Sequence, residues 1–224
     1  MTFGVVIFPG SNCDLDAIYA VSKALGQKVL SIWHQESVLP KVDAIILPGG
    51  FSYGDYLRPG AIASRSPVMK AIKNYANQGG WVMGICNGFQ VLVESGLLPG
   101  ILLRNISTRF ISTMEALSVE NQQTPFTRKF TLGQTIRLPI AHKDGNYFAD
   151  PRLLEELKQN KQIVLKYQNN PNGSLEDIAG ICNKEGNVFG MMPHPERAFA
   201  KWLGSSDGLC FFQSMLEAWE EKNE

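Results

Sequence analysis

Several features that would assign a protein to a class at once are missing from this 224-residue sequence. Its 21 Lys and Arg residues are balanced by 21 Asp and Glu residues, so no net charge attracts nucleic acid or an acidic membrane surface. No apolar run reaches the about 18 residues of a membrane span, and no basic leader precedes the first apolar run. We therefore expect a cytoplasmic protein with neither a nucleic-acid nor a membrane partner.

Cysteine is scarce and scattered. The four cysteines, Cys13, Cys86, Cys182 and Cys210, form no C-x-x-C pair and have no histidines at ligand spacing near them. This pattern suggests neither a disulfide framework nor a zinc site, so we expect no metal in this chain. Each thiol then has to be interpreted from its own surroundings.

A nucleotide-binding loop is also missing. The segment 47–60, LPGGFSYGDYLRPG, is rich in glycine and follows an apolar run, but it lacks the G-K-[ST] ending of a phosphate-binding loop. It also lacks the G-x-G-x-x-G pattern followed by an acidic residue about 20 positions later. We expect that this chain binds no ATP and carries no cofactor of its own.

The first half of the chain alternates short apolar runs with helical patterns, which is typical of βα units around a parallel sheet. The apolar runs are nearly continuous in Val, Ile and Leu, so helices are expected on both faces of the sheet and ligands at the carboxyl ends of its strands. Strands are predicted at 4–8, 28–33, 43–47 and 81–85, and helices at 14–25, at 67–77 and from 87 onward.

The second half adds antiparallel strands. Residues 104–140 change to an alternating pattern rich in Thr and Ser, and residues 178–192 predict a hairpin that turns at 184–187. Further elements are a helix at 151–159, a strand at 163–168 and a final helix at 209–221. The predicted architecture is one three-layer α/β/α domain over residues 1–224, with a mainly parallel central sheet plus antiparallel additions.

The sequence Gly84-Ile85-Cys86-Asn87-Gly88 lies between a predicted strand and a predicted helix. It has the G-x-S-x-G form of a nucleophile elbow with sulfur in place of oxygen, and its glycines permit a sharp turn. A thiol at a helix N-terminus is favoured as the nucleophilic thiolate. A small buried cysteine in a packed junction is the alternative that this turn alone leaves open.

A nucleophile needs a base, and three histidines are available. His194 follows a predicted strand between two prolines that restrict the backbone, and Glu196 is close enough in an extended segment to orient its ring. His34 is interpreted as a strand end at the surface, and His142 as a loop residue in substrate or interface contact. Cys86, His194 and Glu196 are therefore the predicted catalytic triad, although either of the latter two alone is more often a structural residue.

The remaining cysteines are weaker candidates. Cys13 also lies between a strand and a helix, but Asp14 and Asp16 oppose a thiolate there and fit helix capping better. Cys182 falls in a hairpin strand and Cys210 in the last helix, so both are predicted to be core thiols.

The Gly49-Gly50 pair at a strand end offers a backbone donor for an oxyanion. Gly50 is the predicted first donor and Asn87, directly after the nucleophile, is the second. Without a nucleophile on the same sheet, the glycine loop would be interpreted as a long surface turn.

The motifs PGG, GICNGFQ and PHPE, in this order, resemble the class I (triad-type) glutamine amidotransferases. FPGSNCD at 8–14 and GGFSYGDYLRPGA at 49–61 further resemble the glutaminase subunit of phosphoribosylformylglycinamidine synthase, an enzyme of purine biosynthesis. The resemblance spans nearly the whole chain and implies the flavodoxin-like fold of that family.

The resemblance also implies roles for individual residues. Cys86 is expected to attack the side-chain amide of L-glutamine, and Gly50 and Asn87 to receive the oxyanion. Gln90, one helical turn after Cys86, is expected to contact bound glutamine, as are Gly49 and Phe51.

Further implications concern partners. The family delivers ammonia to a large synthase subunit, often with a small third subunit, and the synthase uses ATP and magnesium to convert formylglycinamide ribonucleotide to its amidine. The segment HKDGNY at 142–147 departs from the HGEGRY typical of relatives, although His142, Gly145 and Tyr147 of a loop implied in partner contact or ammonia passage are present.

Two other classes remain as alternatives. One is a stand-alone cysteine hydrolase of γ-glutamyl or peptide bonds with the same triad, which would need no partner. The other is a non-catalytic scaffold that regulates a synthase, whose expected mark is the loss of a triad residue.

Overall fold

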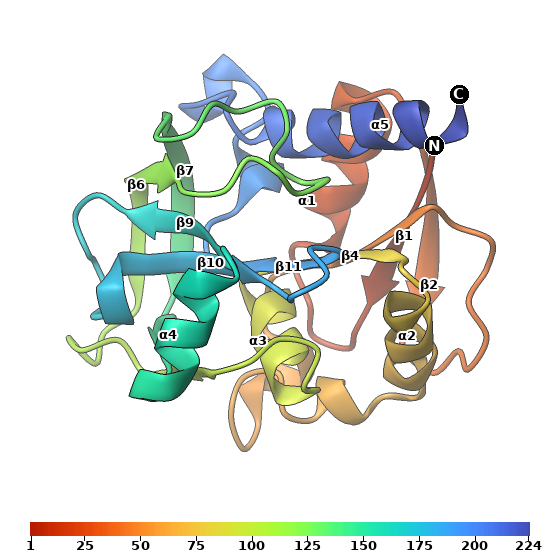
Figure 1. Cartoon of the computed structure of the whole chain (residues 1–224). Helices are drawn as coiled ribbons and strands as arrows, with labels where there is room; N and C mark the ends of the chain where they lie inside the picture. Colours follow the sequence, from red (N-terminus) through yellow and green to blue (C-terminus); the bar gives the residue numbers. More distant parts are fainter.

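The computed structural model of the protein describes all residues from 1 to 224 and contains a central nine-stranded sheet (Figure 1). The strand order is β2-β1-β3-β4-β11-β10-β9-β6-β7. The strands are β1 (Thr2–Ile7), β2 (Lys28–Trp33), β3 (Ala44–Leu47), β4 (Trp81–Ile85), β6 (Ile111–Val119), β7 (Thr135–His142), β9 (Ile163–Tyr167), β10 (Ile178–Cys182) and β11 (Val188–Met191).

Five strands, from β2 to β11, run parallel to one another. Their order follows the 2-1-3-4-5 pattern of flavodoxin-like sheets, with β11 in the fifth place. All four residues of β3 and of β11 are buried, which confirms that the continuous apolar runs indicate strands covered on both faces. The carboxyl ends of these strands meet along one edge of the sheet, where a ligand site was expected.

Helices cover both faces of the sheet. Figure 1 shows α1 and α5 on one side and α2, α3 and α4 on the other. The first predicted helix is interrupted, because a π-helical turn at Ala20–Ala24 follows α1. The helices are α1 (Asp14–Tyr19), α2 (Pro67–Asn77), α3 (Asn87–Glu94), α4 (Pro151–Gln159) and α5 (Leu209–Asn223).

The remaining strands extend the sheet in the antiparallel sense, as the alternating pattern predicted. β6 pairs with β7 over eight residue pairs, and β10 forms the predicted hairpin with β11. A small second sheet of β5 (Ile101–Leu103) and β8 (Asn146–Phe148) was not predicted. Its strands have three residues each, which is too short to give an alternating pattern.

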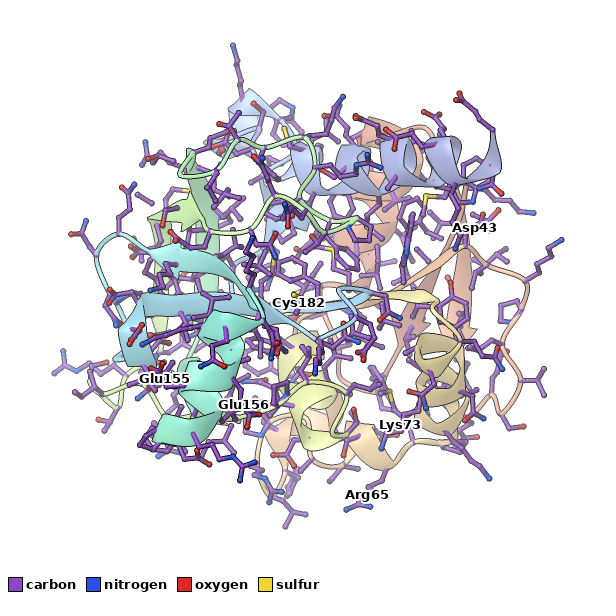
Figure 2. All side chains as sticks on the ribbon, in the orientation of Figure 1. Asp43, Arg65, Lys73, Glu155, Glu156 and Cys182 are labelled. Carbon is purple, nitrogen blue, oxygen red and sulfur yellow. The ribbon has the colours of Figure 1, made fainter.

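The cysteines outside the candidate site lie on the elements that the sequence predicted. Cys182 on β10 is buried in the interior of the molecule (Figure 2), and burial raises the pKa of its thiol to about 12. Cys210 on α5 is partly buried.

No helix has the length and apolar character needed to cross a membrane.

Close packing between α3 and β3 gives a stability prediction. A Cβ atom on Gly88 would overlap the carbonyl group of Leu47, and backbone atoms cannot rotate away. We expect Gly88→Ala to lower the free energy of unfolding by about 2 kcal/mol or more and the melting temperature by about 4–8 °C. Gly96→Ala is the control, because that position is open and carries only the strain of positive φ. Equal melting temperatures for the two variants would contradict the predicted overlap.

Candidate active site

Cys86 occupies a strained turn between β4 and α3. Its backbone has φ 49° and ψ −105°, and its N–H donates to the carbonyl of Met191 at 2.7 Å. The flanking glycines are required by space, because a Cβ on Gly84 would meet Leu92 and the Gly88 backbone. The sharp turn that the G-x-C-x-G pattern predicted is therefore present, and such strain is characteristic of functional positions.

His194 and Glu196 follow β11, which runs parallel to β4 with Met191 paired to Ile85. The His194 N–H donates to the carbonyl of Pro139 on β7 at 2.8 Å, which fixes the backbone of this segment. The His194 Nδ1–H donates to Glu196 Oε1 at 2.6 Å, and both residues are 1 % exposed. This contact leaves Nε2 as the nitrogen able to exchange a proton.

Gly49 lies between the nucleophile and the base. A Cβ at this position would stand 2.7 Å from Cε1 of His194 and 3.3 Å from the Cβ of Cys86. Both side chains thus lie against the same backbone atom from different strands, and a side chain at residue 49 would separate them. The structure brings together all three residues of the predicted triad.

The surroundings of His194 favour its protonated form. Burial by itself lowers the pKa of His194, but the Glu196 carboxylate and the thiol groups of Cys86 and Cys13 outweigh it and raise that pKa well above 6.5. The His194 Nε2 atom is buried and has no hydrogen-bond partner. A buried polar atom without a partner is costly, so this nitrogen is a candidate to receive a reacting group.

The two predicted oxyanion donors are Gly50, in the loop after β3, and Asn87, at the start of α3. Gly50 has φ 115°, and a Cβ there would stand 2.5 Å from the backbone nitrogen of Asn12, so only glycine fits. Asn87 is the first residue of α3, where a backbone N–H has no partner within the helix. Its side chain accepts from the Ser52 N–H at 3.2 Å, which ties the glycine loop to α3.

The other residues predicted to bind substrate differ in their exposure. Gln90 is buried and its Nε2 donates to the backbone oxygen of Asp144 at 2.6 Å. Phe51 is 43 % exposed and lies 6.4 Å, between ring centroids, from the exposed Phe110. Gln90 therefore lies inside the site, whereas Phe51 lies at its rim.

Cys13 is closer to the site than the sequence indicated. Its sulfur, a nitrogen of His194 and an oxygen of Glu196 all lie within 4.8 Å of one another. Arg197 donates to the Cys13 sulfur at 3.2 Å and to Asp16 at 2.9 Å. Asp16 is thus paired with a guanidinium group from a distant part of the chain. The nearby guanidinium also disfavours a metal cation at this cluster.

His142 is a buried residue of β7 and not the loop residue that the sequence suggested. Its Nδ1 lies 3.1 Å from Asn105 Oδ1, and this oxygen also accepts from the Gly145 N–H at 3.1 Å. Burial, reinforced by the charge of His194, lowers the pKa of His142 to about 4. A neutral ring in contact with Asn105 holds the 142–147 loop, and no sequence motif placed Asn105 there.

His34 directly follows β2, as the sequence predicted, but it is buried and not at the surface. Its Nδ1 lies 2.7 Å from the hydroxyl oxygen of Tyr53, which also lies 3.1 Å from the hydroxyl of Ser66. The glycine loop that carries Tyr53 therefore covers the ring. His34 has a structural partner of its own and takes no part in the triad.

Asp55 and Asp144 also belong to this region, and sequence reasoning missed both. Asn87 Nδ2 donates to Asp55 Oδ1 at 3.3 Å, and Asp144 contributes the backbone oxygen that binds Gln90. Burial, with a further contribution from the Asp144 charge, raises the pKa of Asp55 to about 6. The signal that the sequence offered for Asp55 was an acidic residue inside the glycine-rich segment 47–60.

Known proteins resemble the chain over its whole length. The family of CobB/CobQ-like glutamine amidotransferase domains matches residues 2–208. Among solved structures, one chain of PurLQS from Thermotoga maritima is 47% identical, with a TM-score of 0.89 and coverage of 97% of this chain and 98% of that chain.

Two more distant structures share the fold. A putative GMP synthase protein from Thermoplasma acidophilum is 16% identical, with a TM-score of 0.68 and coverage of 100% of this chain and 98% of that one. A glutamine amidotransferase from Thermotoga maritima is 14% identical, with a TM-score of 0.61 and coverage of 99% and 83%.

The three histidines allow a direct titration of the site. We expect the His194 ring to titrate well above pH 6.5, and His34 and His142 below it, because burial lowers the pKa of both of the latter. Glu196→Gln removes the negative charge that favours the imidazolium, so the pKa of His194 should fall and its proton should be lost at lower pH. Proton NMR of the imidazole rings measures this, with His34 as the internal control. A His194 pKa unaffected by Glu196→Gln would contradict the pairing.

Proposed function

The chain belongs to the family of CobB/CobQ-like glutamine amidotransferase domains, and from this membership we propose that residues 1–224 form one glutaminase domain. The identity of 47% over nearly the full length of a PurLQS chain confirms the resemblance predicted from the sequence motifs. The function is that of the glutaminase subunit of phosphoribosylformylglycinamidine synthase in purine biosynthesis. The observation that carries the catalytic assignment is the contact of Cys86 and His194 with the same glycine, together with the His194–Glu196 hydrogen bond.

In the first half of the reaction, the Cys86 thiolate attacks the side-chain amide carbon of L-glutamine. The carbonyl oxygen becomes an oxyanion, which the N–H groups of Gly50 and Asn87 receive. Protonated His194 then gives its Nε2 proton to the amide nitrogen, the carbon–nitrogen bond breaks, and ammonia leaves a thioester on Cys86. The raised pKa of His194 suits this role, because the ring must hold a proton at neutral pH.

In the second half, neutral His194 takes a proton from a water molecule, and the resulting hydroxide attacks the thioester carbon. The carbon–sulfur bond breaks, the new carboxyl group loses its proton to solvent and glutamate leaves, and the proton on His194 restores the starting pair with the Cys86 thiolate. Glu196 keeps the ring in the orientation that presents Nε2, as its 2.6 Å hydrogen bond to Nδ1 requires.

The ammonia is destined for a synthase partner. The PurLQS relative is named as an assembly, and the exposed Phe51 and Phe110 at the rim of the site offer apolar area to such a partner. The partner synthase would bind ATP and Mg²⁺ and use the ammonia to make the amidine. A small third subunit completes this proposed complex.

Two alternatives fit the observations less well. A stand-alone cysteine hydrolase would use the same triad, but it does not account for the near full-length similarity to a chain of PurLQS. A non-catalytic scaffold is disfavoured, because Cys86, His194 and Glu196 are all present and in contact through Gly49 and the Glu196 hydrogen bond.

Covalent labelling tests the nucleophile. The glutamine-like electrophile 6-diazo-5-oxonorleucine should attach to Cys86, because this thiol lies in the strained turn at the start of α3, next to the proposed oxyanion donor Asn87. Cys86→Ala should lower the rate of glutamate release by at least about 10⁴-fold while still binding the synthase. Cys210→Ala is the matched control and should keep both labelling and activity. Peptide mass spectrometry that finds the label on Cys13 would refute the assignment.

The partner requirement is tested by kinetics. We expect glutamate release from glutamine to rise by about 5- to 150-fold when the synthase partner is added with its nucleotide substrates, a range typical of coupling between sites. Equal rates with and without the synthase would favour the stand-alone hydrolase.

A further inference from the structure

The residue at the N-cap of α1 is a cysteine whose side chain does not cap the helix. Cys13 directly precedes Asp14, and Ser, Thr, Asp or Asn are preferred at such a position because their oxygen atoms accept from N–H groups of the first turn. The Cys13 side chain makes no capping hydrogen bond, and the residue is buried. The proposed catalytic steps do not use this thiol either. A buried thiol at a position that favours oxygen therefore needs another explanation.

The Cys13 sulfur lies against the segment that carries two residues of the triad. It lies within 4.8 Å of a nitrogen of His194 and of an oxygen of Glu196, and both of these residues are buried. The sulfur lies 3.3 Å from Oδ1 of the neighbouring Asn12 and accepts from Nη2 of Arg197 at 3.2 Å. Cys13 is thus placed directly beside the pair of side chains that is proposed to move the proton.

Arg197 holds this contact from the turn that follows His194. The turn is the short helix Pro195–Arg197, and the Arg197 backbone N–H donates to the His194 carbonyl at 3.2 Å. The guanidinium group reaches the start of α1 twice, through Nη2 to Cys13 and through Nε to Asp16 Oδ2 at 2.9 Å. Backbone and side-chain contacts of one arginine therefore tie the segment after β11 to α1.

The hydrogen bond between His194 and Glu196 does not by itself fix the imidazole ring on both sides. Glu196 Oε1 accepts from the ring at 2.6 Å, whereas Oε2 is buried and has no hydrogen-bond partner. A side chain that must hold one geometry needs packing by its neighbours in addition to its hydrogen bonds. Burial lowers the pKa of His194, whereas the Glu196 charge and the thiols of Cys86 and Cys13 raise it. The Cys13 sulfur thus supports both the place and the protonated form of the ring.

We propose that Cys13, held in place by Arg197, is a positioning residue of the glutaminase site that keeps the His194 ring in its productive orientation. This proposal rests on the proposed glutaminase function and deepens it, because it assigns a role to a thiol that forms and breaks no bond. Without the sulfur, the ring tilts and holds its proton less strongly. Proton transfer then slows, while the binding of glutamine is unaffected.

The first test replaces the sulfur in the assembled complex with the synthase. We expect Cys13→Ala and Cys13→Ser to lower kcat for glutamate release by about 10- to 100-fold with KM for glutamine within about threefold, because a misplaced proton-transfer group slows the reaction. Cys210→Ala is the matched control and should keep kcat. Unchanged kcat in both Cys13 variants would overturn the proposal.

The serine variant separates positioning from folding. Serine is favoured at a helix N-cap, so Cys13→Ser should keep or raise the melting temperature while it loses activity, and it replaces Cys13→Ala if that variant does not fold. A cysteine that served only the fold would lose stability and rate together. A Cys13→Ser loss of rate that is fully explained by a lower melting temperature would therefore overturn the proposal.

The pH profile gives a readout that a purely structural role does not move. Burial lowers the pKa of His194, but Cys13 is among the groups that raise it, so the imidazolium of both Cys13 variants should lose its proton at lower pH. The alkaline limb of kcat should move to lower pH. Proton NMR of the full chain should show the same change for the His194 ring, with His34 unchanged. A slower enzyme with an unmoved alkaline limb and an unmoved His194 titration would overturn the proposal.

A double-mutant cycle tests the role of Arg197. Arg197→Met keeps an apolar stem but removes the donor to the sulfur. If Arg197 acts through Cys13, the double variant with Cys13→Ala should be at most about threefold slower than the slower single variant. Arg128→Met, which removes an ion pair with Glu221, is the matched control and should keep kcat. Losses that multiply in the double variant would overturn the link between the two residues. A wild-type complex that releases no glutamate from glutamine would instead refute the proposed function itself.

Discussion

The parallel pairing of β4 with β11 is the constraint on which the site depends. Ile85 is in register with Met191, and the N–H of Cys86 continues the ladder to the Met191 carbonyl at 2.7 Å. This pairing joins residues more than 100 positions apart and sets the ends of both strands side by side. A shift of the register would move Cys86 away from His194, since the rise along a strand is about 3.3 Å per residue.

Glycine makes this close approach possible. Gly49 lies just after β3, the strand on the other side of β4, and its missing side chain lets Cys86 and His194 lie against the same backbone. Gly88 likewise has no side chain, which lets the first turn of α3 pack against the Leu47 carbonyl. The proposed reacting groups are therefore held by three adjacent parallel strands, and a rigid support of this kind gives the precise geometry that covalent catalysis needs.

Local patterns in the sequence predicted much of the fold and of the candidate site. The apolar runs predicted β2 and β4, and the helical pattern predicted α2, with the bounds that the structure has. The glycines around Cys86 predicted the turn, and the two-residue spacing of His194 and Glu196 predicted their hydrogen bond. These features depend on neighbours in the chain, so periodicity and turn chemistry can reveal them.

What the sequence by itself determined is most of the strands and helices, the elbow at Cys86 and the residues proposed as the triad. Only the tertiary structure decided that Cys13 lies beside His194, that Asn105 holds His142, and that Asp55 accepts a hydrogen bond from the Asn87 side chain. Each of these pairs joins side chains from segments that are far apart in the chain. Their distances follow from how the strands are ordered in the sheet, and no local pattern encodes that order.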